Sequence, residues 1–128
     1  MTEEEVKRRL LNLEDRWTER KPQSAGKDDM RKTLVAFANS VPDGEEAILF
    51  IGVGDQGQIL GVDNPDKMQM SVRQYAELCY PAMHHTSRVI ECEGKHFVAV
   101  IVQPDHNRAL PYYRTCPVTL MDNPATFF

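Results

Sequence analysis

Apolar residues recur every three or four positions in three stretches of the chain, and this spacing lines one face of a helix. The clearest stripe consists of Met30, Leu34, Phe37 and Ala38. The pattern predicts an N-terminal helix over residues 1–13 with a Thr2–Glu5 capping box, a second helix that ends near Asn39, and a third that starts at Pro65 after an Asn64 cap.

Two other runs are apolar at successive positions, as expected for strands that are buried on both faces. These runs, residues 47–53 and 97–102, are expected at the centre of a sheet. The turn Gly54–Gly57 is expected to lead into a strand over 58–62, and Glu93–Lys95 to join strands over 87–92 and 96–102. Short edge strands are expected within 14–21 and 111–114. The prediction is an α/β (α+β) domain, with a mixed sheet of about five or six strands and about three helices.

A chain of 128 residues has the length of one domain, so residues 1–128 are expected to form a single unit. Residues 115–128 show no recognisable pattern. The chain has no membrane-length apolar run and opens with Glu3–Glu5, which predicts a soluble, cytoplasmic protein. Its three cysteines, Cys79, Cys92 and Cys116, are widely separated, which favours buried thiols over a disulfide framework or a zinc site.

Positive charge is concentrated in the first quarter of the chain. Residues 1–32 hold nine Lys and Arg against eight Asp and Glu, a net charge of +1, whereas the remainder holds six against eleven, a net charge of −5. Any basic surface that attracts phosphate must therefore come from this segment. A solvated helix surface with mixed charges accounts for the same asymmetry.

Three carboxylates are candidates for a divalent-cation site, because Mg²⁺ and Mn²⁺ prefer oxygen ligands. They are Glu14, Glu19 and Asp55. In a regular strand, a spacing of five would point Glu14 and Glu19 to opposite faces, so they could meet only if Glu14 precedes the strand or lies on a bulge. Spacing alone favours the alternative of surface carboxylates and a turn aspartate.

Three blocks of the sequence carry a resemblance to a known family. They are Glu14, Glu19 and Lys21; Lys32 with Ala36–Ser40; and Ile51–Val53 followed by Asp55, Gly57, Ile59 and Gly61. These blocks resemble the AlbA-type domain of the Schlafen family. The order and spacing of the blocks are similar to those of the family over most of residues 10–115. The resemblance implies a domain that binds nucleic acid, with RNA favoured over DNA. The resemblance and the charge distribution together predict six contacts to backbone phosphates: Arg16, Arg20, Lys21, Lys27, Arg31 and Lys32.

The resemblance also implies an alternative activity. Some animal members of the family cleave transfer and ribosomal RNA with two glutamates and an aspartate, which Glu14, Glu19 and Asp55 match. The alternative is a Mg²⁺- or Mn²⁺-dependent endoribonuclease that cleaves structured RNA such as tRNA, with these carboxylates as catalytic metal ligands and Lys21 stabilising phosphate charge. A second alternative is a non-catalytic protein-interaction or regulatory domain.

Assembly follows from the size of the basic segment. The related nucleases grip RNA between two similar lobes, whereas this chain supplies one. A homodimer is therefore expected, with an interface that leaves residues 16–32 exposed, because two-fold pairing would present two copies of the segment to one strand.

Overall fold

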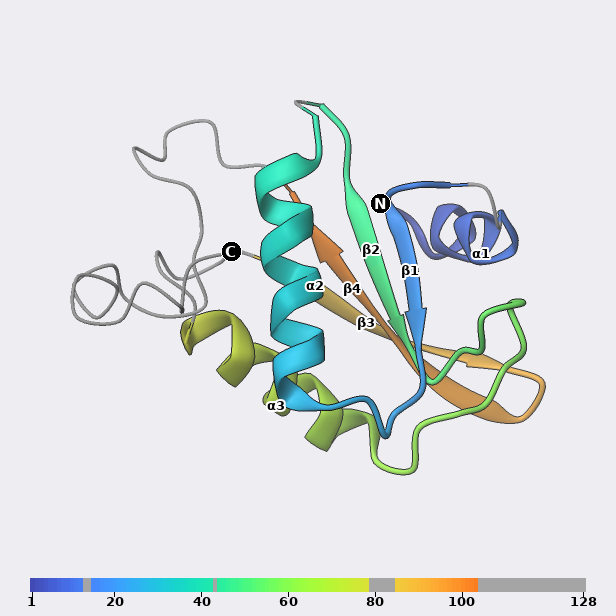
Figure 1. Ribbon diagram of the computed structural model, residues 1–128. Helices are drawn as coiled ribbons and strands as arrows, with labels where there is room; N and C mark the ends of the chain where they lie inside the picture. Colours follow the sequence, from blue (N-terminus) through green and yellow to red (C-terminus); the bar gives the residue numbers. More distant parts are fainter. Residues whose placement is uncertain (13–14, 43, 79–84, 104–128) are drawn as a thin grey trace.

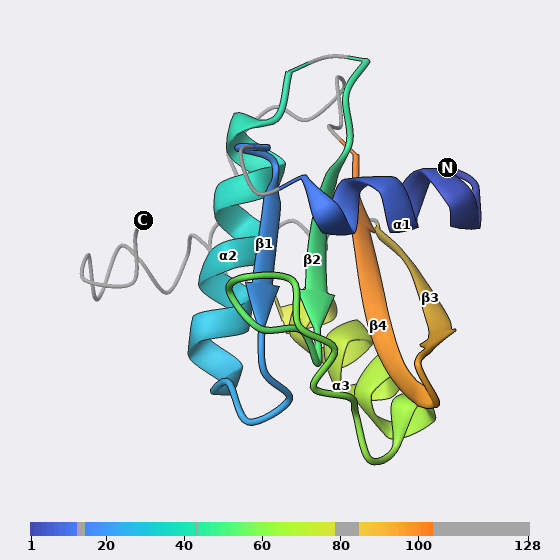
Figure 2. The same ribbon diagram turned by 90° about the vertical axis from the view of Figure 1, so that its right-hand side faces the viewer.

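The computed structural model describes residues 1–12, 15–42, 44–78 and 85–103. They form a mixed α+β domain in the order α1 (Glu3–Leu11), β1 (Thr18–Lys21), α2 (Lys27–Ser40), β2 (Ala47–Ile51), α3 (Pro65–Leu78), β3 (His85–Cys92) and β4 (Lys95–Val102). Helices α2 and α3 cover one face of the sheet, and α1 crosses the other (Figures 1 and 2). No helix in these ranges is long and apolar enough to cross a membrane.

The sheet has the strand order β1-β2-β4-β3. β1 runs parallel to β2 through the α2 crossover, whereas β4 is antiparallel to both β2 and β3. The two central strands are therefore the ones predicted from their continuous apolar runs, and β1 is the predicted short edge strand. The hairpin between β3 and β4 is also confirmed.

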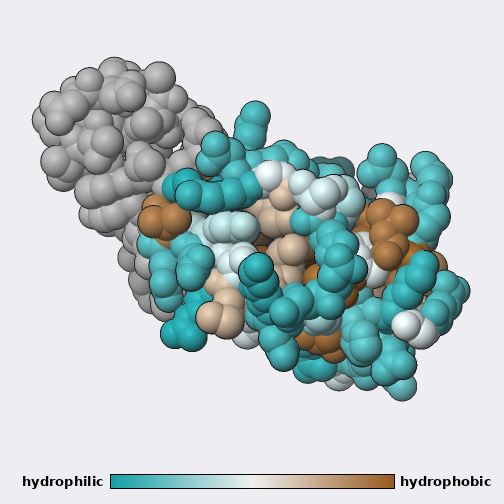
Figure 3. All heavy atoms as spheres, turned by 90° about the horizontal axis from the view of Figure 1, so that it is seen from below, coloured by the Kyte–Doolittle hydropathy of each residue, from teal (hydrophilic) through white to brown (hydrophobic). Residues whose placement is uncertain are grey.

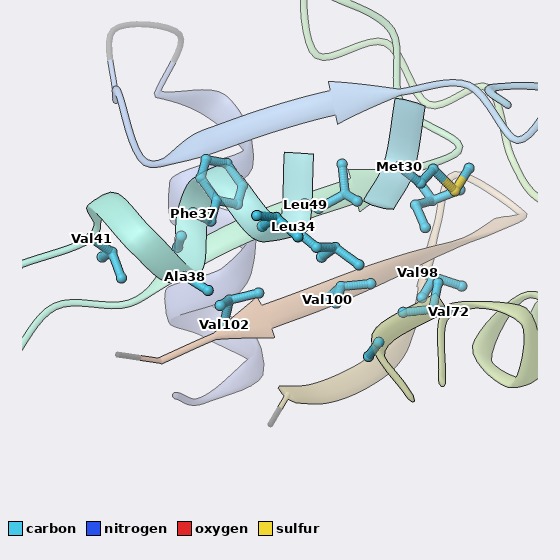
Figure 4. Close-up of a cluster of buried hydrophobic side chains, with 14 of the residues drawn as sticks. Met30, Leu34, Phe37, Ala38, Val41, Leu49, Val72, Val98, Val100 and Val102 are labelled. Atoms are coloured by element: carbon cyan, nitrogen blue, oxygen red, sulfur yellow. The ribbon is translucent and has the colours of Figure 1, made fainter. Parts of the chain in front are cut away.

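The core has two parts because the central strands are buried on both faces. On one face, the stripe of α2 and Val72 of α3 pack against alternate residues of β2 and β4 (Figure 4). On the other face, Val6 and Leu10 of α1 pack with Phe50 and Phe97, whose rings meet edge to face at a centroid distance of 5.9 Å. Helix α1 is thus part of the core.

The helix starts follow the predicted caps. Thr2 and Glu5 form the capping box of α1, and the Lys67 N–H donates to the Asn64 side chain at 3.1 Å in front of α3. Gly26 is the N-cap of α2. Three helices are present in the described ranges, as predicted, and α1 ends at Leu11.

The predicted strand over 58–62 is wrong, and the described residues form four strands instead of five or six. Only an isolated bridge joins Val53 to Ile59. The Leu60 and Gly61 N–H groups both donate to the Gly52 carbonyl at 2.9 Å, so the chain turns inward before a ladder can form. The predicted strand over 111–114 lies outside the described residues.

The prediction of buried thiols is wrong for Cys92, which is partly exposed at the end of the edge strand β3. Cys92 is a free thiol. Cys79 and Cys116 lie outside the described residues.

Candidate nucleic-acid interface

The cations of the predicted basic segment fall into two groups. Arg16, Lys27 and Lys32 are exposed, and none of them forms an ion pair with another described residue. These three side chains are free to contact a phosphate. Arg16 precedes β1, while Lys27 and Lys32 lie on α2, so all three belong to the β1–α2 part of the domain (Figure 1).

Arg20 is buried, with only 8% of its surface exposed. Its side chain lies on the α1 face of β1, where it closes the C-terminal end of α1. Nη2 donates to the carbonyls of Leu10 at 2.7 Å, Asn12 at 3.1 Å and Arg9 at 3.3 Å, and Nε donates to Leu10 at 3.2 Å. The last carbonyls of a helix lack helical donors, so Arg20 supplies them. This position corrects the expectation that Arg20 faces phosphate.

Lys21 and Arg31 are also largely enclosed and are paired with acids of α2. Lys21 Nζ lies 2.9 Å from Asp29 Oδ2, and the Lys21 side chain is 14% exposed. Arg31 Nη1 lies 3.7 Å from Asp28 Oδ1, and the Arg31 side chain is 9% exposed. Both cations would have to leave their carboxylates to bind phosphate, so we leave them out of the interface.

Arg9 connects α1 to both parallel strands. Its guanidinium donates to the Glu46 carbonyl at 2.7 Å, ahead of β2, and to the Trp17 carbonyl at 3.0 Å and Thr18 Oγ1 at 3.2 Å, at the start of β1. It also pairs with Asp15 Oδ2 at 2.8 Å. Arg9 and Arg20 together fix the C-terminal end of α1 against β1.

Asp15 is the acidic centre of this arrangement. Burial raises the pKa of Asp15, but hydrogen bonds from the Trp17 N–H, the Thr18 hydroxyl and the Arg9 guanidinium outweigh burial, and the pKa is lowered. The Trp17 N–H and the Thr18 hydroxyl each donate to the carboxylate at 2.9 Å. The ionised carboxylate thus stabilises the fold.

Replacing Asp15 with asparagine is expected to lower the free energy of unfolding by about 1 to 2 kcal/mol at neutral pH. Because folding lowers the pKa of Asp15, its contribution is complete above the ordinary value of 3.8 and is lost as the pH falls through the folded pKa. The difference in free energy of unfolding between Asp15→Asn and the parent should therefore shrink as the pH is lowered. Urea unfolding from about pH 7 to about pH 3 measures it, and a gap that stays constant would contradict the prediction.

The carboxylates named from the sequence are only partly described. Along β1, Thr18 and Arg20 are buried toward α1, so alternation places Glu19 and Lys21 on the α2 face. Glu19 is exposed there. Glu14 lies outside the described residues.

Asp55 is exposed in the loop that follows β2. This loop bends toward α1: Gly54 N donates to the Gln58 carbonyl at 2.8 Å, and a Cβ on Gly57 would lie 3.7 Å from the Leu10 carbonyl. Within the described part of the chain, no three His, Cys, Asp or Glu side chains are grouped so as to hold a metal ion. Glu19 and Asp55 offer suitable oxygen ligands, but a site for Mg²⁺ or Mn²⁺ would need Glu14 and stays a prediction.

Two further exposed cations within residues 1–32 were not among the phosphate contacts predicted from the sequence. Lys7 and Arg8 lie on the outer face of α1, and the structure brings this helix next to Arg16. The available signal was the charge order within α1, where Glu3–Glu5 fill the first turn and Arg8 and Arg9 the last.

The fold and the site define a class: a small α+β domain with a parallel β1–α2–β2 unit, exposed cations at the β1 edge, and an N-terminal helix fixed by two arginines. A model of the Schlafen, AlbA_2 family matches residues 14–120, and the chain belongs to this family. The suspected family is thus confirmed. No curated protein matches the sequence.

One solved structure supports the fold, and a second is reported for comparison only. The solution NMR structure of the N-terminal domain of an ATP-dependent DNA helicase RecG-related protein from Nitrosomonas europaea is 26% identical, with a TM-score of 0.59 over 80% of this chain and 83% of that chain. The crystal structure of the DIP2311 protein from Corynebacterium diphtheriae is 17% identical, with a TM-score of 0.48 over 75% of this chain and 19% of that one.

Proposed function

We propose that this domain binds nucleic acid, with RNA preferred over DNA, through phosphate contacts at the β1 edge. The observation that carries the proposal is the exposure of Arg16, Lys27 and Lys32 without carboxylate partners among the described residues, while neighbouring cations are paired or buried. Family membership and the similarity to a domain of a DNA-helicase-related protein support it. Phosphate contacts of this kind give affinity with little sequence preference.

The proposal is tested by the salt dependence of binding. Fluorescence polarisation with labelled tRNA and with a DNA duplex, between about 50 and about 200 mM salt, should give affinities that fall linearly on logarithmic axes. The Arg16→Gln/Lys27→Gln/Lys32→Gln variant should lose about 2 to 3 from the slope, or about 1 per contact.

A matched control removes three exposed cations from other surfaces, Lys67, Arg73 and Arg88, by substitution with glutamine. Its slope should stay near that of the parent. Failure of the parent to bind either probe at about 50 mM salt, or binding that salt does not affect, would exclude the proposed function. Stronger binding to the duplex than to tRNA would reverse the RNA preference.

A second candidate is a metal-dependent endoribonuclease that uses Glu14, Glu19 and Asp55 as ligands. Lys21 would stabilise the scissile phosphate after leaving its ion pair with Asp29. Two observations favour this candidate function: Glu19 and Asp55 are exposed, and the chain belongs to the Schlafen, AlbA_2 family. A bound Mg²⁺ or Mn²⁺ would supply an activated water and stabilise phosphate charge. In the same samples, tRNA cleavage that requires the metal, stops with chelator and is lost in Glu19→Ala would support this activity. Equal cleavage by Glu19→Ala and the parent would exclude it.

The protein-interaction alternative gains no support from the surface. The large hydrophobic side chains exposed in the described ranges come from two helices, α1 and α3, and from the loop after β2. They are Leu11, Leu60, Met70 and Leu78. Seen from below, the molecule shows hydrophilic surface with small, separated hydrophobic areas (Figure 3). A docking face would be larger and more continuous.

The homodimer is proposed on the same functional grounds. Among the described residues, β3 pairs only with β4 and lies at the edge of the sheet opposite β1. Pairing of two copies near β3 would leave both β1 edges, with Arg16, exposed to nucleic acid. Light scattering at tens of micromolar should give the mass of a dimer, and a monomer both alone and with RNA would contradict this assembly.

A further inference from the structure

Charge is segregated along α1. Glu3, Glu4 and Glu5 occupy its first turn, while Arg8 and Arg9 occupy its last turn. Figure 2 shows that the helix crosses the sheet with its C-terminal end at β1. The C-terminal end of α1, which carries the two arginines, therefore lies beside the edge that carries the proposed interface.

The outer face of this helix end is available for contact. Val6 and Leu10 are buried against the sheet, whereas Lys7 and Arg8 are exposed and form no ion pair within the described ranges. Leu11 follows one turn after Lys7 and is 74% exposed. Two cations and an apolar side chain thus share one solvent-facing surface.

This surface is held in a fixed position relative to Arg16. Arg9, which follows Arg8 in the sequence, forms an ion pair at 2.8 Å with Asp15, which precedes Arg16. This ion pair brings the two exposed arginines to the same end of the helix. Arg20 closes that end through its hydrogen bonds to the last carbonyls of α1. The backbone that carries these cations is therefore ordered before binding, and only their side chains lose conformational freedom when they contact phosphate.

We infer that Lys7 and Arg8 of α1 extend the nucleic-acid interface beyond the β1 edge and contact backbone phosphates together with Arg16. This inference rests on the proposed function and adds a second element, α1, to the surface. Leu11 lies where it can pack against a sugar or a base of the bound strand.

A competing explanation is purely structural. Cations in the last turn of a helix stabilise it through the helix dipole, typically by a few tenths of a kcal/mol at an exposed position. That role applies to Arg8, which lies in the last turn, and predicts a loss of stability when it is replaced, with no change in the salt slope of binding. The two roles therefore differ in a measurable quantity.

The test compares the full chain with the Lys7→Gln/Arg8→Gln variant. With labelled tRNA as the probe, the logarithmic salt slope should fall by about 1.5 to 2, and the affinity at low salt should drop, while the urea midpoint changes little. The matched control is Lys67→Gln/Arg73→Gln, which removes two exposed cations from α3 on the opposite face of the sheet. The control should keep the parental slope.

Each outcome decides the inference. If the parent binds tRNA and the α1 variant keeps its slope, α1 is not part of the interface, although the proposed function stands. An equal loss of slope in the α3 control would show that only net charge matters and would also overturn the inference. No binding by the parent would overturn the proposed function and this inference with it.

Discussion

Replacing Arg20 with methionine is expected to lower the free energy of unfolding by about 3 kcal/mol, because charged hydrogen bonds at the end of α1 are lost. Arg20 is 8% exposed, and its guanidinium donates to the carbonyls of Leu10 at 2.7 Å and Asn12 at 3.1 Å. Methionine keeps the apolar stem but leaves these carbonyls without the donor. The melting temperature should fall by roughly 10 °C, and urea unfolding should show the same loss.

The control is Arg16→Met, which removes an exposed cation four residues away and should change stability by less than about 0.5 kcal/mol. For RNA binding the order is reversed, and the larger effect is expected in Arg16→Met. Arg16→Met should reduce the salt slope by about 1, whereas folded Arg20→Met should keep it. An Arg20→Met protein that is as stable as the parent but has a reduced slope would return Arg20 to the interface.

The layout of the fold was readable from the sequence because its strongest signals are local. The continuous apolar runs that became β2 and β4 can be buried on both faces only in the centre of a sheet. The capping box at Thr2 and the cap at Asn64 likewise depend on residues three positions apart. Such patterns survive folding because neighbouring parts of the chain produce them.

The misassigned strand shows where local reasoning ends. Residues 58–62 carry a strand-like pattern after a good turn, and a ladder was the reasonable expectation. The Gly52 carbonyl instead accepts from both Leu60 and Gly61, and the Val62 N–H donates to the His96 carbonyl at 2.8 Å. The partner on β4 is far away in the sequence, so no local pattern could reveal it.

For the candidate site, the sequence predicted only which segment is rich in positive charge. The sequence located the positive segment but could not tell a phosphate contact from a structural cation. Arg20 and Arg31 read as surface charges, yet both are buried. The C-terminal end of α1 covers Arg20, whose guanidinium donates to the carbonyls of Leu10 and Asn12. Lys7 and Arg8 were passed over since the link from α1 to β1 runs through Arg9 and Asp15, which are six residues apart but joined only in the folded chain.

Gly52→Ala is the second change expected to have a large effect. Gly52 has a φ of +93°, which L side chains rarely adopt, and a Cβ there would lie 2.7 Å from Val62 Cγ2 and 3.0 Å from the Gly61 backbone. The left-handed backbone costs an alanine about 1 kcal/mol, and the overlap adds about 2 kcal/mol or more. The variant should therefore lose about 3 kcal/mol in urea unfolding.

Gly94→Ala isolates the steric part of this loss. Gly94 has a similar φ of +77° in the β3–β4 turn, but nothing lies within 4 Å of the position of its Cβ. Its loss should be about 1 kcal/mol, the cost of the backbone conformation alone. Gly52→Ala must also displace the carbonyl that accepts from Leu60 and Gly61, which shifts the loop that carries Asp55. Equal losses in the two variants would mean that the chain around Gly52 yields freely, and that this turn does not fix the position of Asp55.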